Sequence, residues 1–145
     1  MSLAALEAGV AFNNASVTLI HGMSRPIGAL FHIPHGLSNA ILLSECFCFA
    51  LDGAYERFAD LGRAIKVAHH ADDDRTAAEN FLKACEELCS ICEIPTLEEY
   101  GIDRNRFFEV TDKMADDAIN SGSPANTIKK ITKKDIIKIY KKLWK

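Results

Sequence analysis

The first third of the chain combines a helical pattern of apolar positions with a segment rich in helix breakers. Residues 3–21 carry apolar side chains at spacings of three, four and seven, which predicts a helix with one buried stripe. Residues 22–36 hold three glycines and two prolines and predict an ordered, turning connection. A second helix is predicted from Ser38, a suitable N-cap, to Leu51. The stripe of the first helix consists of Leu3, Leu6, Val10, Val17 and Ile20, and it continues to His21.

The remaining sequence repeats this helical periodicity. Helices are predicted over about 54–69, from the N-cap Asp74 to about 93, and from near Asp103 to the break at 121–124. The last helix begins with the capping-box spacing Thr132 to Asp135 and continues to the end. No segment alternates apolar and polar residues as a strand does, and no repeat of fixed period occurs. The sequence therefore predicts an all-α fold, one domain over residues 1–145, built as a single bundle of about six helices.

Charge is distributed unevenly along the chain. The net charge is −3, but residues 129–145 contain eight lysines and one acidic residue, which leaves residues 1–128 at −10. This basic end suits an anionic membrane or a nucleic acid if its apolar side is exposed. The stripe of Ile136, Ile139, Tyr140 and Leu143 favours docking on the bundle with solvated lysines instead. We therefore predict neither a nucleic-acid partner nor a membrane partner.

The composition favours a cytoplasmic protein. The chain has five cysteines, an odd number, and 48% hydrophobic against 26% charged residues, as in ordinary soluble domains. The most apolar run near the start, residues 3–20, is interrupted by Glu7, Asn13 and Asn14 and has no preceding basic region. It fits neither a signal peptide nor a transmembrane span.

Two histidines flank the breaker-rich segment. His21 and His35 are each followed by glycine and lie fourteen residues apart. Two neutral imidazoles held on one fixed segment can bind a divalent transition metal. On spacing alone, two core histidines hydrogen-bonded to backbone are the favoured interpretation.

The surrounding sequence resembles a known family. HGMSRPIGALFHIPHGLSNAILL resembles the pattern of the iron-containing alcohol dehydrogenases, in which a first His-Gly and a later Pro-His-Gly occur. CEIPTLEEYGID and SGSPANT followed by DIIKIYKKLW resemble later segments of that family, so that the likeness runs from about Ala4 to Lys145. The resemblance implies the family's C-terminal metal-binding helical domain, a dehydroquinate synthase-like fold.

The resemblance also implies roles for particular residues. His21 and His35 match two of the family's metal ligands, for Fe²⁺ or for Zn²⁺ where zinc displaces it. The family's other two ligands, an Asp and a His on an upstream helix, have no counterpart in this sequence. Arg25 stands where some members carry a proton-relaying histidine. Arg25 stays protonated near neutral pH, so it would orient a substrate oxygen or a cofactor phosphate, or be only a solvated or structurally paired arginine.

The parent activity implied is NAD(P)-dependent interconversion of small alcohols or diols with aldehydes or ketones. The 145 residues contain no GxGxxG, no GGGS and no strand-turn-helix unit, so we expect the nucleotide-binding domain to be absent. Two hypotheses stay open: the metal-binding domain of such an oxidoreductase, or a truncated or standalone helical module that catalyses nothing and pairs with a separate chain. In either case an apolar patch around Met23, Ile27 and Phe31 is expected to favour a homo-oligomer.

Three other groups of candidate ligands have simpler explanations. Cys85, Cys89 and Cys92 lie on one predicted helical face and are expected to pack in the core rather than to bind zinc. The stretch 69–74, two histidines followed by three aspartates after Ala71, is expected to place cations and anions at neighbouring helix ends. His32 is expected to support the site or the structure, since no family ligand matches it.

Overall fold

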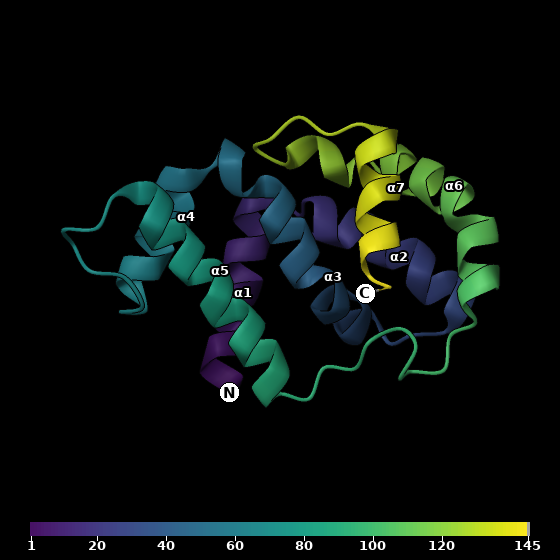
Figure 1. Cartoon of the computed structure of the whole chain (residues 1–145), viewed down its shortest axis with the longest axis horizontal. Coiled ribbons are helices and arrows are strands. Elements are labelled where there is room, and N and C mark those ends of the chain that lie inside the picture. Colours follow the sequence, from purple (N-terminus) through teal and green to yellow (C-terminus); the bar gives the residue numbers. More distant parts are fainter. Residues whose placement is uncertain (145) are drawn as a thin grey trace.

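The computed structural model of this chain is all-helical over the residues it describes, 1–144 (Figure 1). These residues form seven α-helices and two short 3-10 helices and contain no strand, which confirms the all-α class. The elements are α1 (Ser2–Ala15), α2 (Leu19–Phe31), α3 (His35–Ala50), η1 (Leu51–Gly53), α4 (Tyr55–Ala64), α5 (Asp74–Ile91), α6 (Arg104–Asn120), η2 (Ser123–Asn126) and α7 (Lys133–Lys142).

The first predicted helix is in fact two helices. The chain breaks at Ser16, whose φ of 63° is left-handed, and α2 starts at Leu19 with its axis bent 107° from that of α1. The predicted connection over 22–36 is also wrong, because α2 continues through the buried Pro26 and ends only at Phe31. Tertiary burial here outweighs the cost of about 3 kcal/mol that a proline imposes inside a helix. His21 consequently lies in the first turn of α2.

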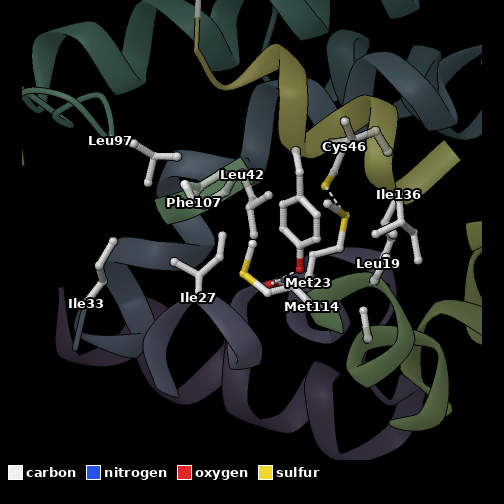
Figure 2. Packing of buried hydrophobic residues seen from close by; sticks show 14 residues of the cluster. Leu19, Met23, Ile27, Ile33, Leu42, Cys46, Leu97, Phe107, Met114 and Ile136 are labelled. Carbon is white, nitrogen blue, oxygen red and sulfur yellow. Dashed lines mark hydrogen bonds between the residues drawn. The ribbon is translucent and has the colours of Figure 1, made fainter. Parts of the chain in front are cut away.

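The main core surrounds α2. Its buried side chains come from α2, α3, α6, α7 and the segment before α6, and Figure 2 shows Met23 of α2 beside Cys46 of α3. Fully buried members include Leu19, Met23, Ile27, Leu42, Leu97, Phe107, Met114, Ile136 and Tyr140. The patch expected around Met23 and Ile27 is therefore wrong, because both side chains are 0% exposed.

Helices α4 and α5 form a hairpin beside this core. Close packing is possible because Gly62 has no side chain: a Cβ there would lie 2.6 Å from the carbonyl oxygen of Ala77. The N-cap of α5 is Asp73 rather than Asp74, and α4 ends at Ala64 rather than near residue 69. The protein's second, smaller core lies around Phe58 and packs the hairpin against the end of α3.

The cysteine face of α5 is less buried than predicted. Cys85 and Cys89 are half-buried, Cys92 is exposed, and Leu88 between them is 57% exposed. The last turns of α5 extend past the hairpin core formed with α4 and adjoin α3 near Cys89, while Leu88, Ile91 and Cys92 stay exposed. The expectation of core packing is wrong for Cys92 and only partly met for the other two.

The C-terminal helix docks as its stripe predicts. Ile136, Ile139 and Tyr140 are buried, and the capping box between Thr132 and Asp135 is formed. Lys133 on the outer side pairs with two α6 carboxylates, at Asp112 and Asp116.

Helix α1 differs from all the others, because none of its residues is buried. The part of the predicted stripe that lies on α1 faces solvent: Leu3, Leu6 and Val10 are between 57% and 67% exposed, and the nearby Phe12 is 55% exposed. Within residues 1–144 no single helix has the length and apolar character to cross a membrane, and only the bent pair α1 and α2 passes by length and composition together.

Candidate metal site

The structure brings His21 and His35 together at the junction of α2 and α3. Their ring centroids are 5.2 Å apart, with the ring planes tilted by 58°. His21 comes from the first turn of α2, and His35 is the first residue of α3 after the N-cap Pro34. The 13-residue helix α2 separates most of the sequence between the two histidines. Their rings meet because α2 and α3 pack against each other.

Both histidines occupy the same local motif, which the sequence states twice. His21-Gly22-Met23-Ser24 and His35-Gly36-Leu37-Ser38 share the pattern His-Gly-apolar-Ser. In each copy the buried serine hydroxyl donates to the histidine carbonyl oxygen three residues earlier, at 3.3 Å for Ser24 and 3.0 Å for Ser38. The serines anchor the first turns that carry the imidazoles. Ser38, predicted as an N-cap, has this role inside α3 instead.

A residue absent from the sequence prediction joins the two rings. Asn39 lies one turn after His35 on α3, and its Nδ2 is 3.3 Å from Nε2 of His21 and 3.2 Å from Nε2 of His35. The other amide atom, Oδ1, is buried and has no hydrogen-bond partner among residues 1–144. The spacing of four between His35 and Asn39 was the available signal, since it places both side chains on one helix face.

Arg25 lies one turn after His21 on α2. Its side chain is exposed, and Nη1 donates to Oγ of Ser123 in η2 at 3.2 Å. This contact supports the structurally paired alternative for Arg25, while the guanidinium stays near the histidines. Gly22 makes the same junction close-packed, because a Cβ there would lie 2.7 Å from Cδ of Pro124.

The surroundings favour a neutral imidazole at His21. Partial burial lowers the pKa of His21, and the neighbouring His35 and Arg25 lower it further. The neutral ring keeps the lone pair that a metal requires. Phe12 of α1 stacks on the His21 ring, with centroids 6.4 Å apart and planes at 15°.

An open cavity of about 350 Å³ adjoins His21 and Asn39. Its wall is largely apolar and comes from the end of α1, the start of α2 and the face of α3. A small molecule placed there would contact His21 and Asn39 from the side of α1.

The other candidate residues lie elsewhere. His32 ends α2 in a left-handed conformation and is exposed, so no helical turn connects it to His35. In the stretch 69–74, Asp73 caps α5 and Asp72 accepts from the backbone of His69. Over the described part of the chain no three His, Cys, Asp or Glu side chains are grouped as a metal site needs.

The chain is similar in sequence to a known protein family. Residues 1–144 match the family model described as "Fe-containing alcohol dehydrogenase family, C-terminal". The NADPH-dependent butanol dehydrogenase of Clostridium saccharobutylicum is 32% identical over 97% of this chain, and the lactaldehyde reductase of Escherichia coli K12 is 29% identical over 99%. The chain spans 36% and 37% of their respective lengths.

Solved structures agree with the sequence comparison. A crystal structure of a 1,3-propanediol oxidoreductase superposes on 94% of this chain with a TM-score of 0.85 and 28% identity, using 35% of its own length. An alcohol dehydrogenase from Oenococcus oeni gives a TM-score of 0.83 at 34% identity over 93% of this chain and 34% of its own. The chain belongs to the iron-containing alcohol dehydrogenase family and corresponds to that family's C-terminal helical domain.

Proposed function

We propose that this chain is the metal-binding helical part of an iron-dependent alcohol dehydrogenase, with His21 and His35 as ligands. The observation that carries the proposal is the convergence of both Nε2 atoms on the single amide nitrogen of Asn39, within 3.3 Å. Two imidazoles aimed at one point are a preformed part of a metal site, because the rings are already ordered before binding.

The residues present fit such a metal in part. Two neutral imidazoles suit Fe²⁺ and also Zn²⁺, and the Oδ1 of Asn39, which has no hydrogen-bond partner among residues 1–144, would be a further oxygen donor if the amide turned. When bound, the metal would act as a Lewis acid on an alcohol oxygen. His21 and His35 would hold it, Phe12 would cover one face of the His21 ring, and Arg25 would orient a substrate oxygen from the next turn.

The nicotinamide cofactor does not fit this chain's own residues. Residues 1–144 contain no strand followed by a Gly-rich turn and a helix, which is the usual support for a dinucleotide. Our assignment of NAD(P) and of small alcohols, diols and aldehydes as substrates rests on the names of the relatives. It refers to a complete enzyme, and for the polypeptide of residues 1–145 alone we propose binding without turnover.

Metal titration by calorimetry tests the histidine site, with Zn²⁺ in air and Fe²⁺ under anaerobic conditions. We expect weak 1:1 binding, because a firm site needs at least three protein ligands. His21→Ala and His35→Ala should each abolish it, while the matched control His32→Ala, which removes an exposed imidazole of the same segment, should leave it unchanged. Binding that survives both ligand substitutions would refute the assignment.

An activity assay separates the two functional hypotheses. The purified polypeptide, supplied with ferrous iron and either NAD or NADP, should oxidise small alcohols no faster than buffer does. Turnover above that background would show that these residues form a complete catalyst, contrary to the proposal. A neighbouring reading frame that encodes a Gly-rich nucleotide-binding domain, with an Asp and a His on a later helix, would rule out the standalone module.

Partners and location follow from the same assignment. We propose a cytoplasmic protein with no nucleic-acid or membrane partner, since the C-terminal lysines lie on the solvated side of a docked α7. We also propose self-association of a second copy through α1. That helix is largely apolar, carries Glu7 as its single charged residue, and buries none of its side chains.

A further inference from the structure

The side chain of Asn39 contacts both candidate ligands. Its Nδ2 lies within hydrogen-bond distance of Nε2 on His21 and Nε2 on His35, although the two rings come from different helices. An amide nitrogen carries two hydrogens and no acceptor lone pair, so it can serve both contacts only as a donor.

This donor character determines the state of each ring. A neutral imidazole has one protonated and one unprotonated nitrogen, and a nitrogen that accepts from Asn39 must be the unprotonated one. Both histidines therefore carry their proton on Nδ1 and present the lone pair of Nε2. In free histidine the opposite tautomer, with the proton on Nε2, is the commoner one. The hydrogen bond made by a ring nitrogen decides which tautomer is held.

We propose that Asn39 is a positioning residue that holds His21 and His35 in the Nδ1–H tautomer and aims both Nε2 lone pairs at one point. Its geometry supports this: the amide comes from the same face of α3 as His35 and reaches across to α2. The consequence for metal binding rests on the proposed function, whereas the tautomers can be observed in the metal-free protein.

The Asn39 side chain is half-buried, and the two hydrogen bonds from Nδ2 account for the orientation of its amide. Its Oδ1 is buried without a hydrogen-bond partner within the described residues, a cost of about 1–3 kcal/mol for such an atom. Two hydrogen bonds from Nδ2 offset that cost. His21 and His35 would hold a metal through the same two lone pairs, and the amide of Asn39 would then be free to turn its oxygen toward the site.

The experiment is a long-range ¹H–¹⁵N correlation spectrum of the metal-free chain with labelled histidine, at a pH where the imidazoles are neutral. We expect His21 and His35 to show the Nδ1–H pattern. Asn39→Ala should move both toward the Nε2–H pattern, and the signals of His32 should not change. Asn39→Asp should move both further, because a carboxylate of the same size only accepts and requires Nε2–H.

Two controls keep the outcome clear. Asn105→Ala removes an exposed amide on α6 and should change neither histidine. Asn39→Asp retains the shape of the side chain, so it remains informative if Asn39→Ala fails to fold. The inference would be overturned if the wild-type histidines showed Nε2–H patterns. It would also be overturned if neither Asn39 substitution changed the tautomers.

Calorimetry with Zn²⁺ on the same chain separates metal binding from the tautomers. Nδ2 donates to the same Nε2 atoms that would bind the metal, so binding would displace those bonds, and calorimetry tests the metal site independently of the tautomers. If the wild-type chain binds no metal but shows the expected tautomers, the proposed function fails and the role of Asn39 stands. If it binds metal with Nε2–H patterns, the role of Asn39 fails and the site stands.

Discussion

The hydroxyl of Tyr140 donates a 2.7 Å hydrogen bond to the carbonyl oxygen of Met23. This buried bond joins residues 117 positions apart and connects α7 to the turn of α2 that follows His21. Burial strongly raises the pKa of Tyr140, so the hydroxyl keeps its proton and remains a donor throughout the range in which the protein is folded. The last helix of the chain thus fixes the helix that carries the first histidine.

Removing this hydroxyl should destabilise the fold measurably. We expect Tyr140→Phe to lower the free energy of unfolding by about 1–2 kcal/mol, because one buried hydrogen bond is lost while the ring packing is kept. Urea denaturation followed by circular dichroism measures this change. Tyr100→Phe, at a more exposed ring, is the control and should differ from wild type by less than about 0.5 kcal/mol. Equal effects from both substitutions would contradict the assignment.

The two His-Gly dipeptides should respond differently to alanine. At Gly22 a Cβ would lie 2.7 Å from Cδ and 2.8 Å from Cγ of Pro124, whereas at Gly36 nothing lies within 4 Å. Gly22→Ala should cost about 1–3 kcal/mol through overpacking between α2 and η2. Gly36→Ala should be neutral or slightly stabilising, since alanine favours the helix. Thermal unfolding of the two variants provides the comparison, and a larger loss at Gly36 would refute the predicted packing.

Acid should destabilise α7, because its capping box depends on the ionised carboxylate of Asp135. The Thr132 hydroxyl and backbone lower the pKa of Asp135 below its ordinary value of 3.8. A depressed pKa in the folded state means that the carboxylate stabilises α7 above the unfolded pKa, and that this contribution is lost as pH falls through the folded value. Asp135→Asn should therefore lower the melting temperature at pH 7 and have little further effect below about pH 3. A variant that stays equally destabilising across this range would exclude the carboxylate as the cause.

Self-association through α1 should depend on its apolar side chains. We expect the wild-type chain to form dimers or larger species with rising concentration in sedimentation or light-scattering experiments. Leu6→Asp should weaken the association at least about tenfold, because burying one leucine contributes about 1.5–3 kcal/mol. The fold should remain intact, since no residue of α1 is buried. Glu7→Gln is the control and should associate at least as well; a wild-type monomer at all concentrations would disprove the interface.

Local sequence signals located most helices but not their ends. The Thr132–Asp135 box caps α7 as predicted, because a cap depends on residues three positions apart. Helix α6 begins next to Asp103, where its start is expected, and Asp103 is its N-cap. The stripe of α7 also packs as expected. The prediction for residues 16–36 is wrong. A proline inside α2 is tolerated because distant elements bury it, and the spacing of apolar residues carries no information about those distant contacts.

The candidate site divides in the same way. The two His-Gly dipeptides single out His21 and His35 in the sequence. The family resemblance then favours metal ligands over core histidines. Their separation of 5.2 Å, the pairing of Arg25 with Ser123, and the bridge made by Asn39 all depend on contacts between elements.

What the sequence determined by itself is therefore the helical class, the caps and the pair of histidines, because each depends on neighbours within one or two turns. The tertiary structure decided that α1 separates from α2, that Met23 and Ile27 are buried while Leu6 and Val10 are exposed, and that one amide joins both imidazoles. The physical reason is that burial is set by what packs against a face, and a periodic stripe indicates that a face is apolar without indicating what covers it.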